Sequence, residues 1–240
     1  SVMKGGVYYA ISWLPGFQVR FNVEASALLI ALVTAFLWVL CSIYSVTYMT
    51  HEGNRLRYDF FSLLTLASNL GVLLAGDFLT LFIFFEGLLI FPYPLIAHKE
   101  DAPAVKGANL YLYVGVATSL LLLSGMVLLK SYTGSLAIQS ISPEISASMG
   151  TAIKYQIAIL MIAGFGGKAG LFFEHFWLPE AHPVAPTPAS ALLSAAMIKA
   201  GAYGIFRVVN LLFVPEGGSI TGDWLTLSNI GYWTIVIGSI

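Results

Sequence analysis

A series of long apolar runs constrains this chain more than any other feature. The runs lie near residues 25–48, 59–76, 78–98, 108–130, 152–173, 188–213 and 224–240. Each is long enough to cross a bilayer, and the residues are continuously apolar rather than alternating, which favours helices. A bilayer leaves no water to satisfy an open backbone, so strands with free edges are excluded. The sequence therefore predicts an all-α integral membrane protein with about seven transmembrane helices.

The overall composition agrees with a membrane protein. Hydrophobic residues make up 58% of the chain and charged residues only 10%, with a mean hydropathy of +0.84; in globular proteins about a quarter of the residues are charged. A net charge of −1 gives no indication of a nucleic-acid partner. The single cysteine, Cys41, excludes an intrachain disulfide and argues against a thiolate cluster. We therefore expect no cofactor in this chain, and we expect any redox group to belong to a partner.

The domain organisation follows from the same runs. Residues 1–24 are expected to form an extramembrane N-terminal segment, and residues 25–240 a transmembrane helical domain. Residues 1–23 show no basic stretch followed by an apolar core, so no signal peptide is recognised. The final run, 224–240, is short and stops without a polar flank. We therefore expect the domain to be incomplete at its C-terminal end.

The loop charges suggest an orientation. The loops after the first and third runs hold basic residues, whereas residues 131–150 contain none. The basic residues in question are Arg55, Arg57, Lys99 and Lys106. Because cytoplasmic loops carry an excess of Lys and Arg, we place these two loops in the cytoplasm. The tight turn at Asp77 then lies on the outer side, with Asp77 most simply acting as a helix cap.

Glu86 is an isolated carboxylate within the apolar stretch "LTLFIFFEGLLIFPYPLIAH". Burying it without a partner would cost several kcal/mol, so it must be protonated, paired or hydrated. Pro92 and Pro94 follow and each removes a helix hydrogen bond, which predicts a kink or local opening beyond the glutamate. The alternative is a structural glutamate that bonds the backbone of a neighbouring helix.

Two lysines also lie within apolar runs. Lys168 is surrounded by four glycines in "GFGGKAG", which weaken the helix and permit close packing or a break. Lys199 lies about 11 residues after Pro188, close to the midplane of its helix. A lysine at this depth is by default a residue of an ion pathway. The alternative, that each ammonium snorkels to an interface, fits both positions poorly.

The segment between the two lysines, "FFEHFWLPEAHPVAPTPAS", is too rich in proline to form one helix. Its irregular backbone is tolerable only when buried in protein or beside water, and Trp177 is of a type found at membrane interfaces. His175 and His182 titrate near neutrality and could relay protons to the lysines; a structural histidine is the alternative for each. Because the helical HExxH arrangement is absent, we expect no metal site.

These motifs resemble a known family. The stretch "FIFFEGLLIFPYPLI", followed by "GGKAGLFFEHFWLPEAHPVAPTPASALLSAAMIKAGAYGIFR", is similar to the antiporter-like subunits shared by respiratory complex I, Mrp sodium/proton antiporters and membrane-bound or formate-linked hydrogenases. The resemblance spans about residues 21–210.

The resemblance assigns roles to individual positions. Glu86 matches the family's glutamate of the fifth helix, Lys168 the lysine of the discontinuous seventh helix and Lys199 the lysine of the eighth. In the family the glutamate and the first lysine form a pair whose separation modulates proton uptake, and the second lysine passes the proton onward. His182 falls in the connecting block on the cytoplasmic side. The chain would then correspond to the first of two inverted repeats, which supplies one half-channel.

The resemblance thus implies a proton-translocating antiporter-like subunit, or half-subunit, in a prokaryotic cell membrane. The implied partners are further antiporter-like subunits, small transmembrane subunits and a peripheral redox module. The chain itself would hold no redox or hydrolytic site, although the complex would be an ion-translocating oxidoreductase. Two alternatives stay open: a subunit of an Mrp-type Na⁺/H⁺ antiporter, and a structural subunit that does not pump.

Overall fold

The computed structural model describes residues 7–14, 17–138 and 149–213. These residues form a β hairpin and a set of long helices, two of which are interrupted. In chain order the elements are β1 (Val7–Leu14), β2 (Phe17–Val23), α1 (Ala25–Glu52), α2 (Arg55–Leu74), α3 (Phe78–Ile90), α4 (Tyr93–Ile96), α5 (Ala102–Thr133), α7 (Thr151–Ala169), the 3₁₀ turn η1 (His175–Trp177), α8 (Leu178–Ala181), α9 (Thr187–Leu192), the π turn η2 (Leu193–Met197) and α10 (Ile198–Phe213).

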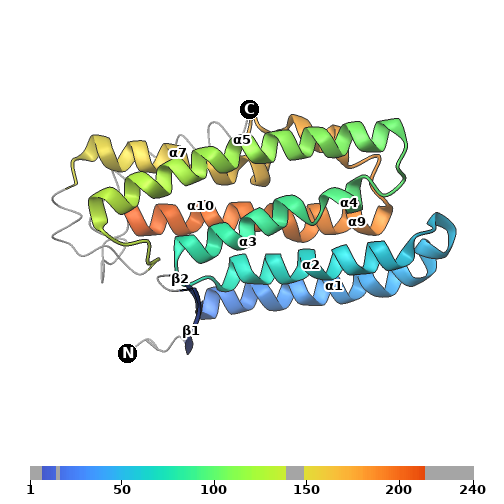
Figure 1. Cartoon of the computed structure of the whole chain (residues 1–240), viewed down its shortest axis with the longest axis horizontal. Helices are drawn as coiled ribbons and strands as arrows, with labels where there is room; N and C mark the ends of the chain where they lie inside the picture. Colours follow the sequence, from blue (N-terminus) through green and yellow to red (C-terminus); the bar gives the residue numbers. More distant parts are fainter. Residues whose placement is uncertain (1–6, 15–16, 139–148, 214–240) are drawn as a thin grey trace.

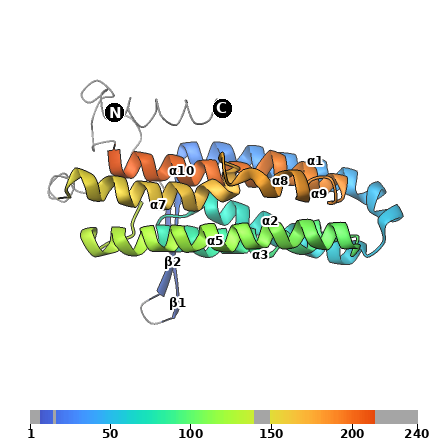
Figure 2. The same ribbon diagram turned by 90° about the horizontal axis from the view of Figure 1, so that it is seen from above.

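The long helices lie side by side along the long axis of the molecule (Figure 1). Viewed from above, α2, α3 and α5 form one layer, and α1, α7 and α10 form the other (Figure 2). Helix α7 packs against α5 in the opposite layer and against α10 in its own. Residues of α3, α5 and α7 therefore meet in the interior of the bundle.

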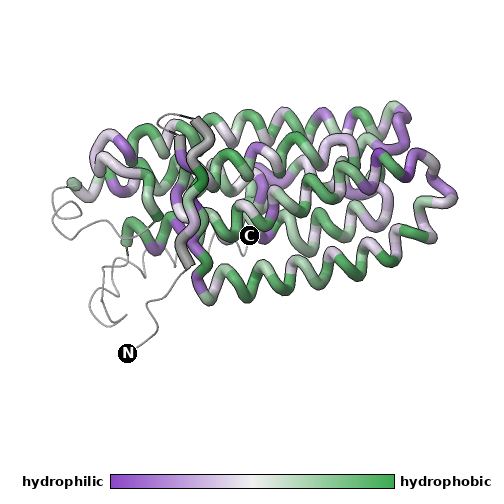
Figure 3. Tube along the Cα trace, turned by 60° about the horizontal axis from the view of Figure 1, so that its bottom comes forward, coloured by the Kyte–Doolittle hydropathy of each residue, from purple (hydrophilic) through white to green (hydrophobic). Residues whose placement is uncertain are grey.

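The prediction of a helical membrane protein is confirmed for the described residues. Four spans are long and apolar enough to cross a membrane: Ala25–Glu52, Phe78–Ile96, Ala102–Thr133 and Thr187–Phe213. Along the long helices most residues are coloured as apolar, and hydrophilic residues are frequent at the end that holds the α1–α2 and α4–α5 turns (Figure 3). Helices α2 and α7 are not among these four spans, and the run at 224–240 lies outside the described residues. The count of about seven spans stays a prediction.

The all-α prediction is wrong for the N-terminal segment. Strands β1 and β2 pair antiparallel from Val7↔Val23 to Leu14↔Phe17 and project from the helical layers (Figure 2). The reason is visible in "FQVRFNV", where apolar and polar residues alternate as in a strand with one covered face. Phe21 pairs with Ala75, so the hairpin is attached to the α2–α3 turn.

The predicted helix opening at the prolines is confirmed. Helix α3 ends at Ile90, and α4 begins at Tyr93 directly after Pro92. A second interruption follows Lys168, because α7 ends at Ala169 and Gly170 adopts a left-handed conformation with φ of 74°. Gly170 suits this position because it has no Cβ to strain the left-handed backbone. The N–H groups of Gly170 and Leu171 both bond the carbonyl of Gly166.

The two basic loops lie at one end of the bundle, as the charge pattern predicts. Arg57 in the first turn of α2 pairs with Glu100 of the α4–α5 turn and donates to the carbonyl of His98 at 2.6 Å. The hydrogen bond and charge of Arg57 hold the pKa of the Glu100 carboxyl below its usual range. At the opposite end Asp77 caps α3, since its Oδ1 accepts from the Thr80 N–H at 2.6 Å.

Candidate functional site

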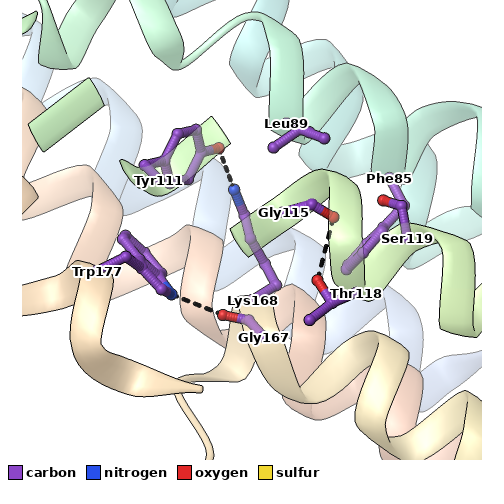
Figure 4. Close-up of a pocket in the computed structure, with 9 residues that line it drawn as sticks. All are labelled: Phe85, Leu89, Tyr111, Gly115, Thr118, Ser119, Gly167, Lys168 and Trp177. Carbon is purple, nitrogen blue, oxygen red and sulfur yellow. Dashed lines mark hydrogen bonds between the residues drawn. The ribbon is translucent and has the colours of Figure 1, made fainter. Parts of the chain in front are cut away.

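Lys168 lies in the last turn of α7 with only 7% of its surface exposed. Its Nζ donates to the main-chain carbonyl of Leu88 at 2.6 Å and to the hydroxyl of Tyr111. The ammonium also lies 4.4 Å from the centroid of the Tyr111 ring, within the range of a cation–π contact. Figure 4 shows the lysine side chain pointing from α7 toward Tyr111 of α5. The ammonium from α7 is therefore held by groups of two other helices, α3 and α5.

The Leu88 carbonyl is free to bind the lysine because of Pro92. In an α-helix the carbonyl of residue 88 accepts from the N–H of residue 92, and proline has no N–H. The Tyr111 hydroxyl also donates to this carbonyl, at 2.5 Å. The proline that ends α3 thus exposes an acceptor inside the bundle, and the lysine and the tyrosine occupy it.

Glu86 lies one half-turn before Leu88 on α3 and is half-buried. Its Oε1 is buried without a hydrogen-bond partner among the described residues. The carboxylate interacts electrostatically with both Lys168 and Tyr111, yet no ion pair joins Glu86 and Lys168 within the described part of the chain. The ammonium is held by a carbonyl and a hydroxyl, with the carboxylate near it but not bonded to it.

A small cavity lies beside the Lys168 side chain. Its volume is about 10 Å³, which is close to the minimum for one water molecule. The lining residues come from α3, α5, α7 and η1 and are Phe85, Leu89, Tyr111, Gly115, Thr118, Ser119, Gly167, Lys168 and Trp177 (Figure 4). Gly167 contacts Thr118 so closely that an added Cβ would lie 2.5 Å from its side chain. Close packing of α5 and α7 therefore keeps the space around the ammonium small.

Trp177 closes the helix break next to the site, and its prediction as an interface residue is wrong. It is 1% exposed, and its Nε1 donates to the Gly167 carbonyl at 2.8 Å. The ring also packs edge-on against Tyr111, with centroids 5.1 Å apart. The indole finds a polar partner at the broken end of α7, which is why it can be buried.

The two histidines have different surroundings. The His182 ring stacks on Trp177 with centroids 6.5 Å apart, and its Nδ1 lies 2.8 Å from Ser190 Oγ. Through Trp177, His182 is therefore connected by contact to the Lys168 site. His175 is exposed and stacks on Phe172, with centroids 5.9 Å apart. The described contacts do not connect His175 to the site.

Lys199 does not lie with Lys168. Its side chain is exposed on the surface of the described chain, and Nζ donates to the Ser194 carbonyl at 2.8 Å. This carbonyl belongs to the π turn η2, in which the Ile198 N–H bonds Leu193 instead of Ser194. Gly201, two residues later, packs against the main chain of Ala169. The two lysines are thus on adjoining helices, but their ammonium groups face different surroundings.

Three contributors to the site escape sequence reasoning. The Leu88 main-chain carbonyl has a signal in hindsight, because a proline four residues after any helical residue frees its carbonyl. Tyr111 is one of several tyrosines in apolar stretches, and nothing in its local pattern distinguishes it. Trp177 reads as an interface residue because the sequence does not show that η1 turns back onto α7.

Comparison with known proteins identifies a family and several relatives. Residues 75–240 match the family model described as "NADH:quinone oxidoreductase/Mrp antiporter, TM". Hydrogenase-4 component B of Escherichia coli K12 is 30% identical over 90% of this chain and 32% of its own length. A Na⁺/H⁺ antiporter subunit of Bacillus subtilis 168 is 31% identical over 85% of this chain and 41% of its own length.

The fold is found in a solved complex as well. A chain of the Mrp complex from Dietzia sp. DQ12-45-1b superposes with a TM-score of 0.79 and 28% identity, over 88% of this chain and 24% of that chain. The present chain spans about a third to two fifths of the length of the two curated relatives above.

Proposed function

Because this chain belongs to the transmembrane family of NADH:quinone oxidoreductase and Mrp antiporter subunits, we propose that it carries protons through part of the membrane. The path includes Glu86, Lys168 and Lys199, and His182 lies on the uptake side. The chain acts as an antiporter-like subunit, or as part of one, within a multisubunit membrane complex. It performs no bond chemistry of its own.

The observation that carries this proposal is the buried ammonium of Lys168. A lysine that is 7% exposed is surrounded by a carbonyl, a hydroxyl and a nearby carboxylate, and it has no ion-pair partner among the described residues. A purely structural role would be filled more easily by a neutral donor, since ionisable groups within a membrane are expensive. A lysine whose ammonium is hydrogen-bonded only to neutral groups among the described residues is suited to gaining and losing a proton.

The switch in this proposal is the distance between Glu86 and Lys168. A carboxylate that approaches a lysine stabilises its charged form, and one that withdraws favours proton release. A change of one pKa unit corresponds to about 1.4 kcal/mol, and the membrane potential supplies about 2.3 kcal/mol per charge per 100 mV. No described residue bonds Oε1 of Glu86, so no hydrogen bond to this atom has to break when the carboxylate moves.

Protons reach Lys168 from the side of the helix break. His182 and Ser190 lie at its edge, Trp177 lies between them and the lysine, and the small cavity has room for about one water molecule. Hydration of this space during turnover completes the connection. From Lys168 the proton passes to Lys199 across the contact between α7 and α10, where Gly201 lies against Ala169.

The exposed Lys199 side chain indicates what the complex must supply. An ammonium in the middle of a membrane span does not face lipid, so another polypeptide segment covers this surface and continues the path. The partners are further antiporter-like and small membrane subunits, with a redox module in the hydrogenase or complex I type of assembly.

Proton movement across inverted vesicles that carry the complete complex tests the proposal. Lys168→Met and Glu86→Gln each lower the initial rate by about tenfold or more, the effect of losing one stabilising interaction of about 1.4 kcal/mol. Lys168→Arg keeps the charge but not the ability to release it, and it stays slow. Lys106→Ala, which removes an exposed lysine near the start of α5 that is paired with Glu180, keeps the normal rate.

Two results would contradict the proposal. Normal proton movement in Lys168→Met, with the complex assembled, would assign the chain a structural role. Transport that depends on sodium and is unchanged in Lys168→Met and Lys168→Arg would instead favour a sodium path that does not use this site.

A further inference from the structure

A second, larger cavity lies at the opposite end of α5 from the Arg57–Glu100 pair. Its volume is about 380 Å³ and its lining is mostly polar. Basic, acidic and apolar side chains contribute to it, among them Arg20, Asp77, Leu79, Lys130 and Leu136. None of these residues belongs to the proton path, so the cavity is a separate site.

The walls of this cavity are fixed by main-chain pairing between three segments. The Gly76 N–H donates to the Arg20 carbonyl at 2.7 Å, and the Phe78 N–H donates to the Leu136 carbonyl at 2.8 Å. The Arg20 N–H donates to Thr80 Oγ1 at 2.9 Å. Strand β2, the α2–α3 turn and the segment after α5 thus form a preformed pocket rather than a loose surface.

The charges in the cavity favour an anion. Asp77 is largely committed, since Oδ1 caps α3 and Oδ2 lies 3.8 Å from Arg20 Nε. Nε and Nη2 of Arg20 both donate to Gln18 Oε1, which leaves the remaining donors of Arg20 available. Within the described part of the chain, Lys130 forms no ion pair, and its side chain is exposed. The two cations exceed the one carboxylate, so the pocket carries net positive charge.

The depth of the cavity matches the headgroup layer of a bilayer. Helix α5 carries Lys106 near its first turn and Lys130 near its last, and residues 107–129 include no charged side chain. At about 1.5 Å per residue this uncharged stretch is about 35 Å long. The hydrocarbon layer of a bilayer is about 30 Å thick. Lys130 therefore lies where lipid phosphates lie, on one side of the membrane.

We propose that this cavity binds the phosphate of an anionic phospholipid headgroup. Lys130 and Arg20 contact the phosphate, and Leu79 and Leu136 contact the apolar part of the lipid beside it. Basic side chains at an anionic membrane surface attract such headgroups, and each contributes about a fivefold gain in affinity. The bound lipid would join the β hairpin to the ends of α3 and α5. This site does not depend on the proposed proton path.

The test titrates the purified complete complex, in neutral detergent, with phosphatidylglycerol, phosphatidylcholine and inorganic phosphate, following thermal stability and lipid retained by native mass spectrometry. Phosphatidylglycerol binds in preference to phosphatidylcholine, and Lys130→Ala weakens its binding about fivefold. Lys130→Arg restores binding. Lys106→Ala, a matched exposed lysine at the other end of the same helix, leaves the affinity unchanged. Because Lys130 is exposed, its substitution leaves the fold intact.

Three outcomes would overturn the proposal. Equal binding of phosphatidylglycerol to Lys130→Ala and to the unaltered protein would exclude the site. An equal loss in Lys106→Ala would reduce it to general attraction between charges. Stabilisation by inorganic phosphate alone that matches phosphatidylglycerol and disappears in Lys130→Ala would assign the cavity to free phosphate instead of lipid.

Discussion

The two lysines within the membrane spans differ in their surroundings and agree in one chemical detail. Lys168 is buried between three helices, whereas Lys199 is exposed on the described surface. Each ammonium nevertheless donates to a main-chain carbonyl that lacks its usual helix partner. At Leu88 the partner is missing because residue 92 is proline. At Ser194 it is missing because the π turn shifts the Ile198 N–H to Leu193.

The shared detail teaches how a membrane helix can offer a lysine a hydrogen-bond acceptor inside the bilayer. A helix carbonyl normally has its hydrogen bond satisfied within the helix, so a lysine gains little from it. A proline or a π turn releases one carbonyl at one chosen position, and such turns are frequent at functional sites. The buried lysine additionally needs a hydroxyl and a nearby carboxylate, which the exposed lysine lacks within the described chain.

The strongest way to break this comparison is Pro92→Ala. The backbone at residues 91 and 92 is already helical, so the new N–H points at the Leu88 carbonyl and competes with Lys168 for it. Hydrogen bonds to charged groups contribute about 1.5–3 kcal/mol. We therefore expect proton movement in vesicles carrying the complex to fall about tenfold or more.

Pro94→Ala is the matched control. It also restores one N–H two residues later, but the carbonyl it faces belongs to Ile90, which is exposed and lies outside the site. A normal rate in Pro94→Ala with a low rate in Pro92→Ala would support the role of the Leu88 carbonyl. Equal rates in both variants would remove the explanation based on a released acceptor.

Tyr111→Phe sharpens the comparison by removing the contact that only the buried lysine has. The hydroxyl donates to Leu88 and accepts from Lys168, and loss of a buried polar partner costs about 1–3 kcal/mol. At about 2–4 °C per kcal/mol, we expect the unfolding temperature of the complex to fall by about 2–12 °C. Tyr113→Phe on the same helix is the control, because Tyr113 is 66% exposed; an equal shift in both variants would mean that the Tyr111 hydroxyl is not stabilising the site.

Much of the fold can be predicted from the sequence because the bilayer restricts the choices. Continuous apolar runs predict the helices, and the prolines after Glu86 predict the end of α3. The hairpin is missed because its alternating segment, residues 17–23, is only one short strand long and lies outside the apolar runs. Helix ends shift by a few residues, as at Glu52 and Thr133, because polar end residues extend a helix beyond its apolar core.

The candidate site can be predicted only in part from the sequence. Glu86 and Lys168 stand out because isolated charges in apolar runs are expensive. Their mutual arrangement is not readable, since the sequence does not give the side-chain directions that lead Lys168 to Leu88 and Tyr111. The exposure of Lys199 also has no sequence signal, because it depends on which segments pack against α10. Sequence thus identifies the charges, and packing decides their partners.

Lys199→Met tests the exposed lysine of the comparison, and it has the smallest expected effect on stability. The ammonium is exposed and bonds one carbonyl within its own helix, so its removal should change the stability of the described fold by no more than about 0.5 kcal/mol. The unfolding temperature of the complex would then stay near its normal value while proton movement decreases. A marked fall in unfolding temperature would contradict this expectation and show that the segment covering Lys199 in the complex also bonds its ammonium, so that Lys199 would resemble Lys168 in its surroundings as well as in its carbonyl contact.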